Sequence, residues 1–303
     1  LYDPAGLNRD ELTRLAKERK MVENFDKKLL SENGFLVTIK ENDVTLPGEE
    51  KAESGLEFRN FFHLNPKFEA DLFVPCGGRP ASININNWKK FVDKEGRPRF
   101  KVISEGANLF ITQEARLRLE ENGVIIFKDA SANKGGVTSS SMEVFASLAL
   151  NDDEYQQLMM VKNGDIPEFR QTYIEEIIDL IRINAKLEFD IIEREKEKKD
   201  IPRVILTDLV SQKINAVTDA VYASDLHKDK RLFENAIQCC CPRVLIKKVG
   251  FERLLERVPD TYLQAIFASR LASRYVYSFG LDANEIDFHK YIESYRCMEF
   301  ERE

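Results

Sequence analysis

Apolar and polar residues alternate differently in the two halves of the chain. In residues 1–150, short apolar runs at 70–75, 101–104 and 124–127 are separated by stretches with helical spacing. Short buried strands separated by helices are typical of a parallel sheet. Each run also ends in a polar, glycine-containing turn. We therefore expect an α/β fold here, with the three runs as neighbouring strands.

The segments around these runs predict helices and one hairpin. Residues 112–123 begin with Thr112, a favourable N-cap, and end at Gly123, so they predict a helix. Helices are also expected over residues 3–22 and 85–93. Residues 35–46 alternate between apolar and polar side chains. That alternation predicts an exposed hairpin or an irregular insertion.

Residues 151–303 show helical spacing throughout. The segment 166–199 carries an apolar stripe and, at 1.5 Å per residue, would reach about 50 Å as one helix. Further helical segments follow, broken near Pro202, Pro242 and Pro259. We therefore expect two domains, an α/β domain over 1–150 and an all-helical domain over 151–303, in which we find no motif for chemistry.

Composition excludes several classes of partner and site. The formal net charge of −7 gives no basic footprint, so nucleic acid and anionic membranes are not expected as partners. No apolar run of about 18 residues occurs, so no membrane span is expected. The five cysteines form no C-x-x-C pair, and we expect reduced thiols and no metal site.

Candidate chemistry gathers where the predicted strands end. In parallel sheets, ligands bind outside the carboxyl ends of the strands. Asn108 and Asn133 offer amides that suit a flat, neutral carboxamide, and Gly135–Gly136 allows close approach of backbone N–H groups. Ser140, near the start of a predicted helix, suits a carboxylate. The alternative for each residue is a capping or turn role, which is favoured for neighbouring Thr138 and Ser139.

Three segments carry a resemblance to a known family. "DLFVPCGG", "VISEGANLFITQEA" and "IIFKDASANKGGVTSSSMEV" resemble the glutamate/leucine/phenylalanine dehydrogenase superfamily, and within it the large NAD-specific glutamate dehydrogenases of fungal type. The resemblance implies that residues 1–150 are the C-terminal part of a Rossmann-like, dinucleotide-binding domain that lacks its first strands. It implies NAD as cofactor and L-glutamate or 2-oxoglutarate as substrate.

The resemblance also assigns roles to individual residues. Asn108 would contact the nicotinamide or its ribose, and Asn133 the nicotinamide end of the cofactor. Gly135 and Gly136 would line the crevice. Val137 would contact the methylenes of the substrate, and Ser140 its side-chain carboxylate. Lys134 stands where smaller enzymes of the family often have alanine.

What the resemblance places outside the chain is equally specific. The glycine-rich fingerprint, the catalytic lysine and the catalytic aspartate would all precede residue 1, so no catalytic residue is expected here. The parent protein would be a homo-oligomer of the cytoplasm or mitochondria that oxidatively deaminates L-glutamate to 2-oxoglutarate and ammonia. The isolated chain is expected to be inactive, with an open apolar sheet edge at 70–75.

Two alternatives differ in class. In the first, the chain is a complete, non-catalytic protein that associates through its helical half and binds nucleotides weakly. In the second, the parent is a related amino-acid dehydrogenase with an apolar substrate. Ser140 disfavours the second alternative, because its hydroxyl would be left without a partner beside an apolar side chain.

Overall fold

A computed structural model describes residues 1–303 except 47–50, 67, 78 and 299–303. The chain forms two compact units, Leu1–Ala70 with Lys89–Arg99, and Asp71–Trp88 with Phe100–Glu303. The expected class, an α/β part followed by helices, is confirmed. The domain boundary expected near residue 150 stays a prediction, and residues on both sides of it lie within the second unit.

The first unit combines short helices with one hairpin. Its elements are α1 (Arg9–Lys17), β1 (Asn42–Thr45), β2 (Lys51–Ser54) and α2 (Gly55–Phe61), with short 3-10 turns between them. The expectation over 35–46, a hairpin or an irregular insertion, holds in part: residues 36–41 are irregular, β1 pairs antiparallel with β2, which lies beyond the segment, and Phe35 bridges Tyr2. Within the alternating segment, regular strand structure is therefore confined to Asn42–Thr45.

The second unit contains the predicted three-stranded sheet. Its strands are β3 (Ala70–Phe73), β4 (Phe100–Ser104) and β5 (Ile125–Phe127), in the order β3-β4-β5. β4 and β5 run parallel with Val102 opposite Ile125, and their central Ile103 and Ile126 are fully buried. Residues 70–72 of β3 are exposed, as expected for a strand at the sheet edge.

The connections around the sheet follow local sequence signals with one exception. α3 (Gln113–Glu121) joins β4 to β5, and Thr112 Oγ1 caps it by accepting a hydrogen bond from Ala115 N. The helix expected over 85–93 is wrong, because only a 3-10 turn at Trp88–Phe91 forms. Asn84 and Asn87 use their side chains to bond the nearby backbone, which competes with helical hydrogen bonds.

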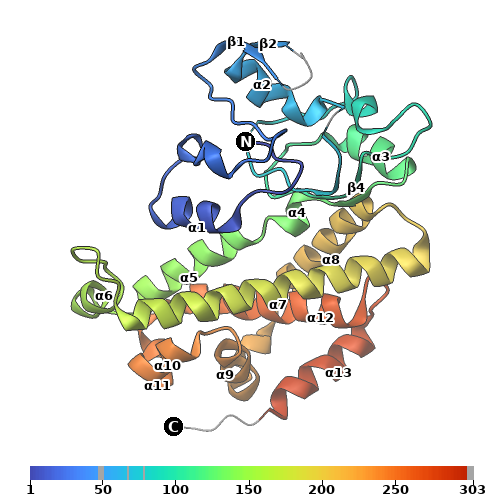
Figure 1. The fold of residues 1–303 in the computed structure, drawn as a ribbon. Coiled ribbons are helices and arrows are strands. Elements are labelled where there is room, and N and C mark those ends of the chain that lie inside the picture. Colours follow the sequence, from blue (N-terminus) through green and yellow to red (C-terminus); the bar gives the residue numbers. More distant parts are fainter. Residues whose placement is uncertain (47–50, 67, 78, 299–303) are drawn as a thin grey trace. The chain divides into compact units, whose positions relative to one another are not determined.

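Helices make up the rest of the second unit, and Figure 1 shows α7 as the longest of them. Pro167, Pro202, Pro242 and Pro259 directly precede α7, α8, α10 and α12, which suits a residue without a backbone N–H. The helices are α4 (Asp129–Ala132), α5 (Gly135–Ala149), α6 (Asp152–Leu158), α7 (Glu168–Lys199), α8 (Arg203–Ala223), α9 (Lys230–Gln238), α10 (Arg243–Val249), α11 (Phe251–Arg257), α12 (Asp260–Phe279) and α13 (Glu285–Arg296).

One apolar core joins α5 to the helices that follow it. Phe145, Ala146 and Ala149 of α5 belong to the same buried cluster as Tyr173 and Ile177 of α7. The buried hydroxyl of Tyr173 also donates to Met142 O at 2.7 Å, which fixes α5 against α7. The helix that carries the candidate site is therefore packed into the helical region.

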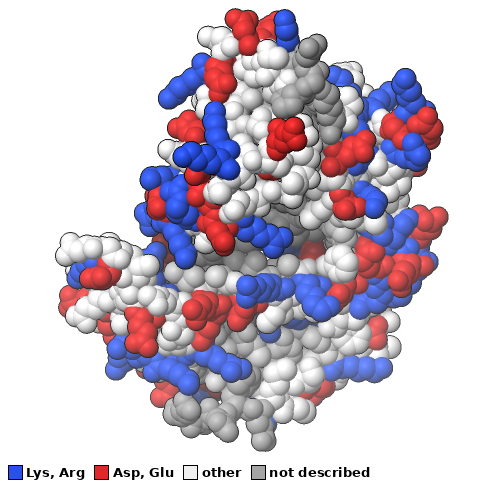
Figure 2. Space-filling model, viewed as in Figure 1, with Lys and Arg blue, Asp and Glu red and all other residues white. Residues whose placement is uncertain are grey.

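The surface carries charges of both signs. Figure 2 shows acidic and basic side chains interspersed across the visible face rather than separated into areas of one sign. Within the described part of the chain, no helix combines the length and the apolar character needed to cross a membrane.

Candidate functional site

The first part of the candidate site is the loop that follows β4. Here the backbone turns at Leu109, whose φ of +59° lies in the left-handed region that side chains rarely adopt. Asp129, at the start of α4, holds this turn because its Oδ2 accepts the Leu109 N–H at 2.8 Å. Asn108, just before the turn, is exposed. The strained backbone thus presents the Asn108 amide at the carboxyl end of β4.

A buried charge cluster lies under this loop. Arg116 of α3 makes two hydrogen bonds to Glu105, with Nε to Oε1 at 2.7 Å and Nη2 to Oε2 at 2.8 Å. Arg116 Nη2 also lies 3.3 Å from Asp129 Oδ2. Glu105 is 0% and Arg116 4% exposed. The cluster therefore joins the end of β4, α3 and the start of α4 around the Asn108 loop.

Burial sets the protonation tendencies of this cluster. Loss of water raises the pKa of Glu105 above its ordinary value, although the hydrogen bonds from Arg116 act in the opposite direction. For Arg116, burial alone would lower the pKa, but Glu105 and Asp129 outweigh it, so the guanidinium pKa is raised. Arg116 is therefore charged, and its guanidinium is the partner of the buried Glu105 carboxyl group. None of the three residues of the cluster was among the predicted site residues.

The structure brings the two predicted cofactor-binding asparagines together. Asn133 Nδ2 donates to Asn108 Oδ1 at 2.8 Å, across 25 positions of sequence. Asn133 is the C-cap of the short helix α4, and Asn108 follows β4. Two separate segments therefore meet through their amides at one edge of the sheet.

The other predicted residues lie on the first turns of α5. Gly135 and Gly136 were expected in a turn that ends a strand, but they form the first two residues of α5, after α4. Val137 is 71% exposed, and Ser140, also exposed, donates from Oγ to Val137 O at 3.1 Å. A Cβ atom at Gly136 would meet nothing within 4 Å, so the space beside this turn is open.

Lys134, between Asn133 and the glycine pair, is turned to a different partner. Its Nζ lies 2.5 Å from Oε2 of Glu188, a residue of α7. Glu188 is 1% exposed. The lysine is therefore engaged with the helical region rather than with Asn108 or Ser140, and no local pattern in the sequence pointed to this pair.

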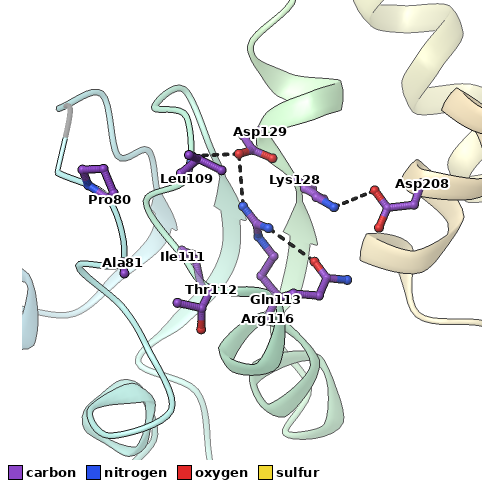
Figure 3. A pocket seen from close by; sticks show the side chains of 10 residues that line it. All are labelled: Pro80, Ala81, Leu109, Ile111, Thr112, Gln113, Arg116, Lys128, Asp129 and Asp208. Atoms are coloured by element: carbon purple, nitrogen blue, oxygen red, sulfur yellow. Dashed lines mark hydrogen bonds and ion pairs between the residues drawn. The ribbon is translucent and has the colours of Figure 1, made fainter.

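A pocket of about 500 Å³ is lined in part by Leu109 and by the Arg116 and Asp129 side chains that support the turn. Figure 3 shows Arg116 and Asp129 at its centre, Gln113 beside Arg116, and Lys128 reaching toward Asp208 of α8. None of the predicted site residues lines this pocket. Its charged side chains are already in ion pairs, Arg116 with Asp129 and Lys128 with Asp208, so we do not assign the candidate site to it.

Metal ligands are not gathered anywhere in the described ranges. Among those residues, no group of three or more histidine, cysteine, aspartate or glutamate side chains is placed to hold a metal ion. All five cysteines are free thiols. The candidate site is therefore built from amides, a hydroxyl and the start of a helix.

The sequence is similar to that of known proteins. The family model of Glutamate/Leucine/Phenylalanine/Valine dehydrogenase matches residues 1–199. The chain is 53% identical to Glutamate dehydrogenase 2 of Dictyostelium discoideum over 294 residues, which are 97% of the chain. It is 46% identical to the NAD-specific glutamate dehydrogenase of Neurospora crassa and 43% identical to that of Saccharomyces cerevisiae, each over 96% of the chain.

The relatives are much longer than the chain. The matched region covers 28% of each of these three proteins. No solved structure matches the chain.

Proposed function

The chain belongs to the Glutamate/Leucine/Phenylalanine/Valine dehydrogenase family, and we propose that it forms one wall of the active site of an NAD-dependent glutamate dehydrogenase. The reaction is oxidative deamination of L-glutamate to 2-oxoglutarate and ammonia. When bound, NAD⁺ accepts the hydride that leaves the α-carbon of the substrate. The observation that carries the proposal is the contact between Asn108 and Asn133 beside the open first turn of α5.

The asparagine pair fits the nicotinamide end of the cofactor. With Asn133 Nδ2 committed to Asn108 Oδ1, the Asn108 Nδ2 group remains to donate and the Asn133 Oδ1 atom remains to accept. A carboxamide needs one partner of each kind. In this role the two side chains orient the nicotinamide ring, and the buried cluster of Glu105, Arg116 and Asp129 holds the Asn108 loop in place.

The first turns of α5 fit the substrate. N–H groups at the start of a helix have no acceptor within the helix, and its dipole favours negative charge there. Ser140 lies on the same exposed side as Gly136 and Val137. Its hydroxyl, released from Val137 O, donates to the distal carboxylate of glutamate, and Val137 covers the methylenes. An apolar substrate would leave the hydroxyl unpaired, which favours glutamate.

The proposal covers the whole natural protein, which we take to be as long as its relatives. Its catalytic lysine and aspartate belong to the part outside residues 1–303, and the 303-residue chain alone is inactive. The same proposal includes a homo-oligomer of the cytoplasm or mitochondria. The competing function, a non-catalytic nucleotide-binding protein, rests on the same asparagine pair. NADH formation by the full-length protein on addition of L-glutamate would exclude it.

A substitution within α5 tests the substrate assignment. In the full-length protein, Ser140→Val removes a hydrogen bond to a charged group. We expect kcat/KM for L-glutamate to fall about 10- to 100-fold. Ser147→Val is the matched control, because Ser147 is also exposed on α5 and its Oγ donates to Val144 O in the same way. Equal kinetics of the Ser140 and Ser147 variants would remove the role of Ser140.

The inactivity of the isolated chain has its own test. The purified 303-residue chain is mixed with L-glutamate and NAD⁺, and NADH is followed by absorbance. We expect no formation above the rate without protein. Sustained glutamate-dependent NADH formation by the isolated chain would overturn this part of the proposal.

A further inference from the structure

Glu188 is the centre of a buried polar network that links the candidate site to the helical region. Its Oε1 lies 3.1 Å from Ser131 Oγ of α4, and its Oε2 accepts hydrogen bonds from Lys134 Nζ and from the hydroxyl of Tyr277 on α12. Ser131 Oγ lies a further 3.1 Å from Thr207 Oγ1 of α8. The two segments on either side of Asn133 thus meet Glu188 of α7, which also accepts from Tyr277 of α12, and Ser131 extends the network to Thr207 of α8.

This network is closed on the protein itself. Both oxygens of Glu188 have partners, which offsets the cost of burying a carboxylate. Burial raises the pKa of the Tyr277 hydroxyl, and the nearby Glu188 charge raises it further, so this hydroxyl stays a donor. The ammonium of Lys134 also lies 6.0 Å from the centre of the Tyr277 ring.

The place of Lys134 in the chain makes this arrangement informative. Lys134 is the N-cap of α5 and makes no side-chain capping bond. A positive charge there is unfavourable, because the start of a helix already carries partial positive charge. The next two residues are glycines, and a Cβ at Gly136 would touch nothing. The side chain of Lys134, rather than a local cap, therefore anchors the start of the helix.

From this geometry we infer that Lys134 is a positioning residue whose ion pair with Glu188 lets the helical region set the orientation of Asn133 and the first turn of α5. The inference rests on the proposed function, since that function gives Asn133 and Ser140 their ligands. Lys134 contacts neither cofactor phosphate nor substrate carboxylate in this role. Its charge serves Glu188.

A contact role and a positioning role predict different kinetics. A lysine that touches a ligand contributes to affinity, and its removal raises the dissociation constant of that ligand. A residue that fixes the geometry of reacting groups contributes to kcat, because small misplacements cost about two orders of magnitude in rate. Glu188 and Tyr277 separate the two roles, since their side chains reach the site only through Lys134 and Ser131.

The experiment is a double-mutant cycle in the full-length protein with Lys134→Met, Glu188→Gln and both together. We expect each variant to lose about 10- to 100-fold in kcat, and the double variant to lose no more than the worse single one. Dissociation constants for NAD⁺ and 2-oxoglutarate should stay within about threefold. Lys134→Arg, which keeps the charge beside Glu188, should recover most of the rate.

Arg194→Met is the matched control. Arg194 of α7 donates from Nη2 to Tyr277 O at 2.7 Å, so it also joins α7 to α12 but does not touch Lys134 or Glu188. We expect this variant to lose stability and keep its kcat. If Lys134→Met does not fold, Tyr277→Phe takes its place, since it removes a single hydroxyl from the same carboxylate.

Three results would overturn the inference. They are additive losses in the cycle, a rise of tenfold or more in a ligand dissociation constant for Lys134→Met alone, and an equal kcat for the Lys134, Glu188 and Arg194 variants. Hydrogen exchange at the amides of Asn133 and Thr138, which bond Asp129 O and Lys134 O, gives a readout that needs no catalysis. If exchange is faster only in the Lys134 and Glu188 variants while the wild type is inactive, the proposed function is refuted. The positioning role of Lys134 is then still supported.

Discussion

Replacing Arg116 by methionine tests how the Asn108 loop is held. Methionine fills a similar volume but leaves the fully buried Glu105 without its bidentate partner. Removing one member of a buried ion pair costs about 3–5 kcal/mol, because a charge is left buried and unpaired. Asp129 keeps its bonds from the Leu109 and Ala130 N–H groups, so most of the loss falls on Glu105.

The loss of unfolding free energy can be measured by urea titration with far-ultraviolet circular dichroism as the signal, since the helices of the second unit dominate that signal. The double variant Glu105→Gln/Arg116→Met removes both charges, and we expect it to recover more than half of the loss. Arg118→Met is the control on the same helix. Arg118 makes an exposed ion pair with Glu121, so Arg118→Met should lower the unfolding free energy by no more than about 0.5 kcal/mol.

The effect of Arg116→Met should also depend on pH. Burial already raises the pKa of Glu105, and without Arg116 this pKa rises further. A carboxyl group with a raised folded pKa stabilises the fold below its unfolded pKa and loses that contribution as pH rises. The unfolding free energy of the variant should therefore fall least, relative to the wild type, near pH 4 and most above pH 7. A loss under about 1 kcal/mol at neutral pH would refute the reasoning.

Two further outcomes follow from the structure. Gly106→Ala should lower the unfolding free energy by about 1–3 kcal/mol in urea titrations, because the new Cβ would lie 3.0 Å from Cys76 Sγ, whereas Gly136→Ala should not destabilise the fold. Hydrogen bonds from Arg14 lower the pKa of Glu11 to about 2, so its stabilising contribution is present above pH 4.5 and lost as pH falls toward 2. In Glu11→Gln, the unfolding free energy should depend less on pH in this acid range. The transition can be measured from the NMR signal of the Asp26 amide, which donates to Glu11 in the wild type.

Local signals in the sequence predicted most elements of the second unit. The three strands, the Thr112 cap and the long helix after Pro167 were predicted because hydrophobic period, capping and proline act within a few residues. The helix expected over 85–93 failed for a local reason as well, the side-chain bonds of Asn84 and Asn87. The hairpin of the first unit was predicted only in part, because β2 lies outside the alternating segment and Phe35 bridges Tyr2, which is distant in the sequence.

In the candidate site, too, some residues were predicted from the sequence and others were not. Family motifs indicated Asn108 and Asn133, and the structure places them in contact, while their ligand roles stay a prediction. The charges that support them were not predictable from sequence spacing. Arg116 and Glu105 are 11 positions apart, and Lys134 and Glu188 are 54 apart. From sequence alone, glutamates and lysines in helical segments are predicted to be exposed, because these residue types are rarely buried without a partner.

The length of α7 ties together contacts that lie far apart along it. Tyr173 bonds Met142 O, Glu188 meets Lys134, and Arg194 bonds Tyr277 O, all from this one helix. With 3.6 residues per turn, deleting one residue between Tyr173 and Glu188 would rotate every later side chain by about 100°. Such a deletion would break the later contacts together. We therefore expect evolution of this protein to have tolerated substitutions on the exposed face of α7 while keeping the number of residues between Tyr173 and Arg194 constant.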